Sequence, residues 1–147
     1  MYNLSLTLHV IAAAIWAGGH IILAIGFLPK ALKDKDPGVI QFFESRYERI
    51  GLPALLVLVI TGFFQAFRML PDFFDWFSFS YSIPTNIAIK LFLLLVTLAL
   101  AIHAKITIIP KLSKDNLKPL AYHIIAITLT AVLMLIVGVS FRFGGFF

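Results

Sequence analysis

His9 and His20 are the residues of this chain best suited to chemistry. They lie eleven residues apart in one apolar segment. At about 100° per residue, this spacing puts both imidazoles within roughly 20° of one helix face and about 16 Å apart along the axis. Histidine is costly in hydrocarbon, so an imidazole there indicates a functional site. Because small residues such as Ala12, Ala13 and Gly19 lie between them, a flat cofactor can approach the backbone, and the pattern predicts a haem-binding helix.

A second polar group is expected at the level of His9, in the half of the membrane assigned below to the outer side. Thr61, Gln65 and Arg68 recur at the i, i+4, i+7 spacing of one helix face. Counting about 1.5 Å per residue from the outer helix ends, His9 lies roughly 8 Å deep and Lys90 roughly 9 Å. We therefore expect an outer haem site, with His9 as axial ligand and Arg68 or Lys90 paired with the propionates. A hydrogen-bond network or a quinone-head pocket is the alternative.

His20, His103 and His123 define an inner level. By the same count His20 lies about 24 Å from the outer side, and the other two roughly 28 Å. His123 shares its helix face with Thr130, whereas His103 lies on an apolar face, about 140° around its helix from Lys90. We therefore predict that His20 and His123 ligate an inner haem and that His103 lies at the interface or faces a partner subunit. Nitrogen ligands at two depths are typical of membrane cytochromes with one or two haems b.

The elements that must position these residues are long apolar helices. Of 147 residues, 61% are hydrophobic and 13% are charged, and the mean hydropathy is +0.99. A soluble domain of this size could not bury so much apolar surface, so the expected surroundings are a lipid bilayer. We predict a single transmembrane domain over residues 1–147, folded as an all-α antiparallel four-helix bundle. Its spans are expected at about Leu4–Leu28, Ile50–Met69, Pro84–Ala104 and Leu120–Phe141.

The distribution of charge predicts the orientation of the bundle. The connection between the second and third spans carries only Asp72 and Asp75, whereas the other two connections are basic (Lys30, Lys33, Lys35, Arg46 and Arg49; Lys105, Lys111, Lys114 and Lys118). The positive-inside rule therefore places both termini outside. A short interfacial helix is predicted over Gly38–Arg49 in the first cytoplasmic loop. The net charge of +5 is thus a topology signal and not a nucleic-acid signal.

Three stretches resemble the CopD/HemJ superfamily of four-helix membrane proteins. The string from His9 to Gly19 (HVIAAAIWAGG), followed by Leu-Pro-Lys at 28–30, is similar to the family's first helix. The stretch 44–54 (ESRYERIGLPA), followed by Thr-Gly at 61–62, resembles the second helix. Lys90 in Ile-Lys-Leu, leading to His103, resembles the third. The order and spacing of the three motifs carry the resemblance.

The resemblance implies two different activities. HemJ proteins bind haem b and oxidise protoporphyrinogen, relying on an early histidine and a lysine, which His9 and Lys90 match. It also makes Lys90 an alternative axial ligand. The HemJ-like Asn-Glu-Pro pattern is missing from the last helix. CopD proteins are implicated in copper uptake or resistance. The chain therefore resembles a small CopD-like member more closely than a HemJ enzyme.

Three functions follow, in order of preference. The first is electron transfer across or within the membrane by His-ligated haem b. The second is a CopD-like copper transport or resistance permease, although the absence of cysteine removes thiolate ligands and Met1, Met69 and Met134 form no ladder across the bilayer. The third is a HemJ-like oxidase, which leaves enzymatic activity open. We expect a multi-pass protein of a prokaryotic cytoplasmic (inner) membrane, with a redox partner or quinone and a homodimer as candidate partners.

Overall fold

The computed structural model describes residues 1–144, and each regular element in this part of the chain is helical. The α-helices are α1 (Tyr2–Ile22), α2 (Leu28–Asp34), α3 (Pro37–Met69), α4 (Ser82–His103) and α5 (Leu117–Ser140). One π-helical turn, Leu23–Phe27, joins α1 to α2, and another, Ala104–Ile108, extends α4. Short 3₁₀ turns lie at Phe74–Phe77, Ile109–Lys111 and Phe141–Phe143.

Four helical rods are long and apolar enough to cross a membrane. They cover Tyr2–Asp34, Pro37–Met69, Ser82–Lys111 and Leu117–Phe143. Between 22% and 33% of the most apolar window of each rod is buried inside the protein, so most of this apolar surface requires lipid. The predicted all-α four-helix membrane fold is therefore confirmed, and the chain is a multi-pass membrane protein.

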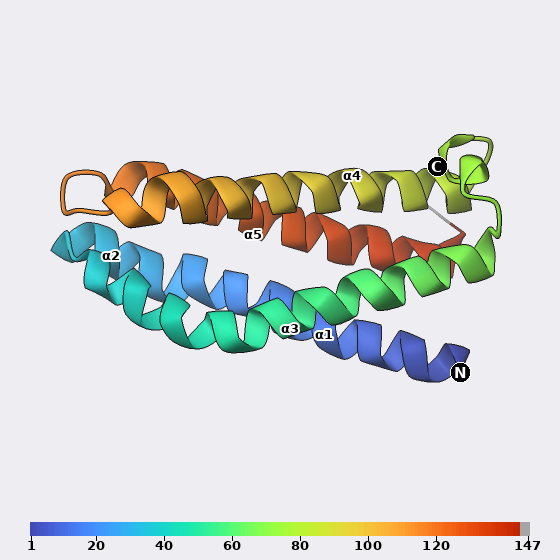
Figure 1. Ribbon diagram of the computed structural model, residues 1–147, viewed down its shortest axis with the longest axis horizontal. Coiled ribbons are helices and arrows are strands. Elements are labelled where there is room, and N and C mark those ends of the chain that lie inside the picture. The colour runs from blue at the N-terminus through green and yellow to red at the C-terminus, as the bar shows by residue number, and fades with distance from the viewer. Residues whose placement is uncertain (145–147) are drawn as a thin grey trace.

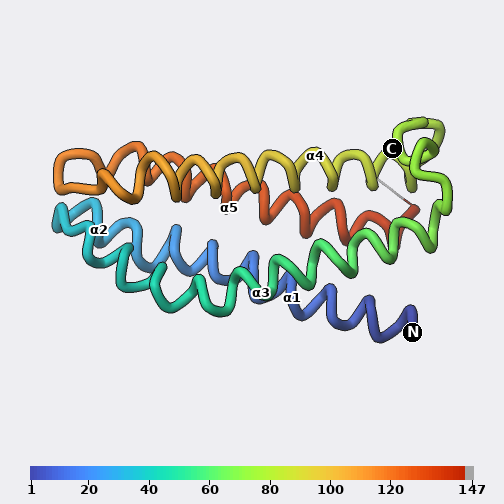
Figure 2. Tube along the Cα trace, viewed as in Figure 1, coloured from blue at the N-terminus to red at the C-terminus, as the bar shows by residue number. Residues whose placement is uncertain are grey.

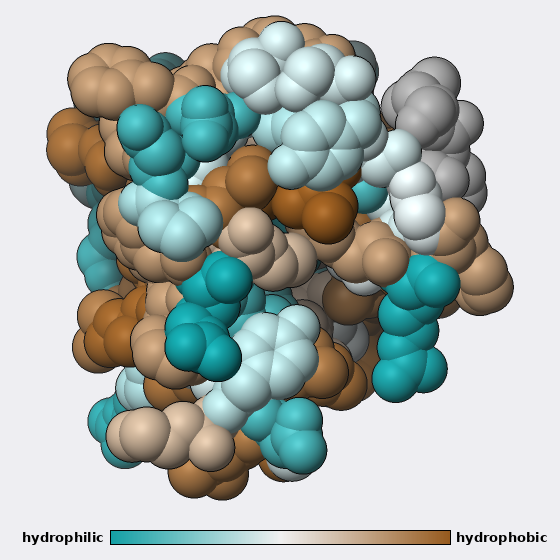
Figure 3. All heavy atoms as spheres, turned by 90° about the vertical axis from the view of Figure 1, so that its right-hand side faces the viewer, coloured by the Kyte–Doolittle hydropathy of each residue, from teal (hydrophilic) through white to brown (hydrophobic). Residues whose placement is uncertain are grey.

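The rods form two antiparallel pairs. Figures 1 and 2 show α1 beside α3 and α4 beside α5, and α1 also packs against α5. The start of α1, the end of α5 and the connection 70–81 lie at one end of the bundle, here called the terminal end (Figure 1). Figure 3 views this end from outside and shows hydrophilic residues scattered among apolar ones. The connections 35–36 and 112–116 lie at the opposite end, here called the basic end. The assignment of these two ends to the two sides of the membrane remains a prediction.

The first connection differs from the expected one. The segment predicted as a separate interfacial helix is helical, but it is continuous with the second span in the 33-residue helix α3. A left-handed residue, Lys35 (φ 49°), ends α2, and the Asp36 side chain caps α3 by accepting a hydrogen bond from the Gly38 amide at 2.9 Å. Pro53 therefore lies inside a helix, where it removes one backbone hydrogen bond. The helix passes through this position as a curved rod (Figure 2).

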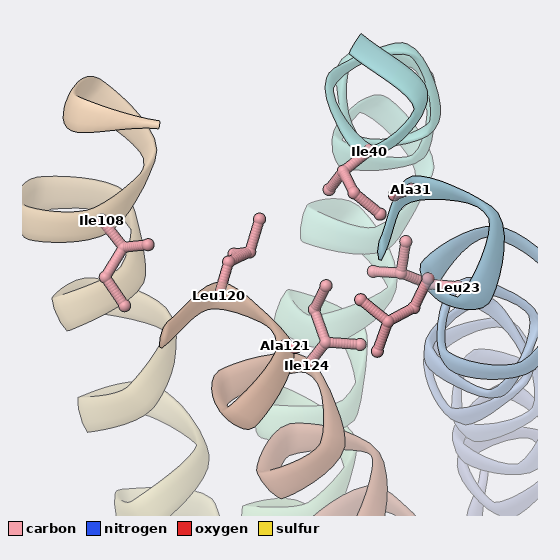
Figure 4. Close-up of a cluster of buried hydrophobic side chains, with 8 residues drawn as sticks. Leu23, Ala31, Ile40, Ile108, Leu120, Ala121 and Ile124 are labelled. Atoms are coloured by element: carbon pink, nitrogen blue, oxygen red, sulfur yellow. The ribbon is translucent and has the colours of Figure 1, made fainter. Parts of the chain in front are cut away.

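Buried side chains gather in three clusters along the bundle. The basic-end cluster joins all four rods (Figure 4) through Leu23, Leu28, Ala31, Ile40, Ile108, Leu120, Ala121 and Ile124. A middle cluster contains Trp16, Ala17 and Ala131. A terminal-end cluster contains Ala66, Trp76 and Ile87. Because these clusters hold the rods at fixed distances and rotations, they determine which polar side chains can meet between them.

Candidate functional site

A cavity of about 160 Å³ lies near the basic end, and each of the four rods contributes to its wall. Its polar lining includes His20 from α1, Tyr47 from α3 and His123 from α5. Glu44, Glu48 and Lys105 complete the polar lining, and Trp16 lies among the apolar residues. Lys105 and Glu48 form an ion pair across the cavity wall between α3 and the extension of α4. The cavity therefore combines two imidazoles with two carboxylates, and we call it the basic-end cavity.

Hydrogen bonds fix the tautomer of His20. Its Nδ1 lies 2.8 Å from the carbonyl oxygen of Trp16, which can only accept, so Nδ1 carries the proton. Nε2 then keeps its lone pair. The Tyr47 hydroxyl donates to the same carbonyl at 2.8 Å, and its ring meets the imidazole edge-on with centroids 5.5 Å apart. The His20 ring is therefore held in one orientation from two helices.

Two glycines make the slot that holds Tyr47. A methyl group on Gly19 of α1 would overlap the Tyr47 ring and lie 2.7 Å from its hydroxyl oxygen. A methyl group on Gly51 of α3 would lie 2.8 Å from the opposite side of the ring. Both glycines are needed because the ring occupies the space that a larger side chain would fill. This close packing of α1 on α3 places the phenol beside His20.

His103 and His123 form a direct pair. His123 donates Nδ1–H to the carbonyl of Pro119 at 3.0 Å, so its Nε2 is an acceptor. His103 Nδ1 lies 2.9 Å from that Nε2 and must therefore donate, which leaves His103 Nε2 with a free lone pair. The two rings stack at 16° with centroids 4.9 Å apart. His103 is exposed and His123 is half-buried, so the pair lies at the edge of the α4–α5 contact.

His9 repeats the same hydrogen-bonding pattern toward the terminal end. The hydroxyl of Thr61 donates to the Val57 carbonyl at 2.6 Å, so its oxygen accepts from His9 Nδ1, 2.7 Å away. His9 Nε2 is then the nitrogen with the lone pair. At His9, His20 and His103, a hydrogen bond therefore occupies Nδ1–H and leaves Nε2 available. This is the arrangement that metal-ligating histidines adopt.

The other residues predicted for the outer site, Gln65, Arg68 and Lys90, differ in whether they face the bundle or its surface. Gln65 is buried, with 9% of its surface exposed, whereas Arg68 is exposed. Lys90 points toward α5, since its ammonium lies 3.5 Å from the position that a Cβ on Gly138 would take. It also lies 5.7 Å from the centre of the Phe141 ring. The structure thus turns Gln65 and Lys90 into the bundle and leaves Arg68 at its surface.

The inner residues agree in part with the sequence-based expectation. His20 and His123 line one cavity, as expected for residues of a shared inner site. His103 and His123, which the sequence predicts as alternatives, contact each other. Sequence analysis also missed Tyr47, although the two glycines that make room for it were visible in the sequence. Thr61 was placed on the expected face and is the direct partner of His9.

The basic-end cavity does not fit a haem as the structure stands. Its volume of about 160 Å³ lies below the roughly 300–1,000 Å³ of pockets that hold drug-sized organic ligands. Trp16 packs against the His20 ring with centroids 4.4 Å apart and so fills space beside it. Within residues 1–144, no three His, Asp or Glu side chains are grouped closely enough to hold a metal ion. The donor set therefore consists of paired and single imidazoles.

Comparison with known proteins yields one family. The family model described as copper resistance protein D matches residues 42–141, which cover most of α3, all of α4 and α5, and the connections between them. No curated protein and no solved structure matches the chain. The match confirms the predicted resemblance on its CopD side.

Proposed function

We propose, since the chain belongs to the copper resistance protein D family, that it binds copper ions within the membrane and takes part in their transport. The observation that carries the proposal is the state of the histidines. At His9, His20 and His103 a hydrogen bond fixes the protonated Nδ1 and leaves Nε2 with a lone pair. Imidazole nitrogen is a common ligand of copper, and the sequence provides no thiolate that would compete with it.

The His103–His123 pair is the proposed primary binding site. In the absence of metal a proton joins the two rings through the 2.9 Å hydrogen bond. A copper ion between these two nitrogens would displace the His103 Nδ1 proton, which is taken up by the free Nε2 of the same ring. Two bonds of about 2 Å each then require the nitrogens to move roughly 1 Å apart in a near-linear arrangement. Because His103 is exposed, its ring has room for this movement. Cuprous ion accepts two nitrogen ligands in this geometry.

The basic-end cavity supports the proposal as an entrance for cations. His123 and His20 both line it, with Glu44 and Glu48 in the same wall. Carboxylates raise the local concentration of cations. A copper ion that enters from the basic end would meet carboxylates first and imidazole nitrogens next. Copper is in this proposal the transported ion and not a resident cofactor.

Competition with a chelator tests the primary site. The purified protein in detergent is loaded with Cu(I) under reducing, oxygen-free conditions and titrated with a colorimetric Cu(I) chelator. We expect His103→Phe and His123→Phe to lower the Cu(I) affinity at least tenfold while keeping an aromatic ring in place. The double variant should lose no more than either single variant, because both residues serve one ion. The neighbouring exposed Tyr122, changed to Phe, is the control, and unchanged affinity in both histidine variants would contradict the proposal.

Haem remains the second candidate because His20 and His123 line one cavity from two helices. Binding would require α1 and α5 to separate, since the cavity is small and Trp16 lies on the His20 ring. An oxidised and dithionite-reduced absorption spectrum of the same preparation distinguishes the candidates. Sharp reduced α and β bands that disappear in His20→Ala would favour haem over copper.

A further inference from the structure

The bundle has an open side between α3 and α4. The packed pairs are α1 with α3, α4 with α5, and α1 with α5. At the terminal end, Ala66 of α3 and Ile87 of α4 share a cluster with Trp76. Toward the other end the basic-end cavity lies between the rods, and the two exposed residues of its wall are Leu52 of α3 and Lys105 of the α4 extension. The cavity therefore meets its surroundings between α3 and α4.

An ion pair bridges the open side at the entrance of the cavity. Glu48 lies one helical turn before Leu52 on α3, and its carboxylate accepts from the ammonium of Lys105. This is the one ion pair that residues 1–144 form. Both side chains line the cavity, and both are partly exposed, 63% for Lys105 and 39% for Glu48. The ion pair thus lies where the interior of the cavity meets the surroundings.

Glu44 supplies a second carboxylate near the entrance. It lies one helical turn before Glu48 on α3, and it also lines the cavity. Within the described residues it forms no hydrogen bond and no ion pair. Two carboxylates and one ammonium leave one negative charge unbalanced, so the entrance attracts cations. The ammonium of Lys105 is itself a cation on a flexible stem, and it already occupies the carboxylate that an entering cation meets.

The backbone and the exposure of Lys105 both allow the ion pair to open. Lys105 lies in the π-helical turn Ala104–Ile108, directly after the end of α4 at His103. Such turns are rare, and they are frequent at functional sites. An ion pair between exposed long side chains is weakly stabilising, because water solvates both charges when they separate. Opening therefore requires no change in how the four rods pack.

We propose that Lys105 is a tethered cation that closes the entrance of the basic-end cavity by holding Glu48, and that metal cations enter when this ion pair opens. An entering cation competes with the ammonium for the carboxylates and displaces Lys105 toward water. His20 and His123 line the cavity behind the ion pair, so its opening gives the cation access to both imidazoles. The proposal rests on the proposed function only in taking copper as that cation.

Thiol labelling measures access to the cavity without copper. The chain contains no cysteine, so Ile127→Cys, at a buried position of the cavity wall, introduces a single reporter. The purified protein in detergent reacts with a cationic (trimethylammonium) or an anionic (sulfonate) methanethiosulfonate. We expect Lys105→Met to raise the labelling rate at least tenfold for the cationic reagent and less for the anionic one, because the freed carboxylates attract only the former. Lys111→Met removes an exposed lysine outside the cavity wall, and this control should label at the parent rate.

A charge exchange separates the ion pair from a general effect of charge. Lys105→Glu should label fast, whereas the double variant Lys105→Glu, Glu48→Lys restores the pair in reverse and should label as slowly as the parent. Ala101→Cys, a half-buried reporter on α4 in the cavity wall, should respond as Ile127→Cys does, and the exposed Ser113→Cys should not respond. Labelling of Lys105→Met at the parent rate, or a charge exchange that labels as fast as Lys105→Met, would overturn the proposal. That result leaves the proposed function standing, because no copper is present, and an unchanged Cu(I) affinity in the histidine variants leaves the labelling result standing.

Discussion

The Tyr47 slot gives the most direct test of how α1 and α3 fit together. Gly18 and Gly19 are neighbours in α1, yet a methyl group on Gly18 would meet no atom within 4 Å, whereas one on Gly19 would overlap the Tyr47 ring. The ring cannot move away freely, because Gly51 on its other side leaves only enough space for hydrogen. Both substitutions therefore add one methyl group, but only the methyl group of Gly19→Ala collides with a neighbouring side chain.

The structure predicts that the two substitutions change the free energy of unfolding in opposite directions. Gly18→Ala should stabilise the protein by about 0.5–1 kcal/mol, because alanine is the better helix former. Gly19→Ala gains the same amount but forces overpacking that costs about 1–3 kcal/mol or more. The helix-propensity gain cancels between them, so the two variants should differ by about 1–3 kcal/mol in the free energy of unfolding.

Unfolding in mixed micelles with increasing dodecyl sulfate, followed by circular dichroism at the helix band, measures this difference. Tyr47→Leu provides the rescue, since it removes the ring that the added methyl meets. In that background Gly19→Ala should cost little, so the two changes should couple by about 1–3 kcal/mol. If Gly19→Ala is as stable as Gly18→Ala, or if Tyr47→Leu fails to rescue it, α1 and α3 do not pack as described.

Two further predictions concern the interior and the copper site. Thr97 and Thr130 are buried with their hydroxyl oxygens 3.1 Å apart, but each also forms a hydrogen bond with a carbonyl of its own helix. A double-mutant cycle with valine should therefore give a coupling energy between the two residues of only about 0.6 kcal/mol. A coupling energy above about 2 kcal/mol would contradict this. Cu(I) affinity should fall as the pH drops from about 8 to 5 and binding should release protons, because a protonated imidazole cannot ligate a metal. Affinity independent of pH over this range would exclude imidazole as the main ligand.

The sequence predicted the number and position of the spans because the hydropathy of a span depends only on the residues of that span and not on its neighbours in the fold. It predicted less well how far each helix extends beyond its apolar part. The charged and aromatic segment at 38–49 was expected to form its own helix at the membrane surface, yet α3 begins at Pro37 and runs through Pro53. Its first turns pack on the basic-end cluster through Ile40, and this burial could not be seen from the periodicity of the segment itself.

Helical spacing predicted which side chains face inward more reliably than it predicted their partners. Thr61 and Gln65 are buried as their shared face required. The pairing of His103 with His123 depends on the rotation of α4 against α5, which no single-helix argument can supply. A residue at the edge of a helix contact can be exposed and still touch the neighbouring helix. For this reason His103 can lie on an apolar helix face and still pair with His123.

The two ends of the bundle offer different sets of ligands, and this bears on where copper binds. The basic-end cavity presents imidazole lone pairs and carboxylates, which attract a cation. Toward the terminal end His9 offers a lone pair as well, but its contact is the single hydroxyl of Thr61 and not a second imidazole. Copper should therefore bind at the His103–His123 pair in preference to His9, because two imidazole nitrogens meet only at that pair among the described residues.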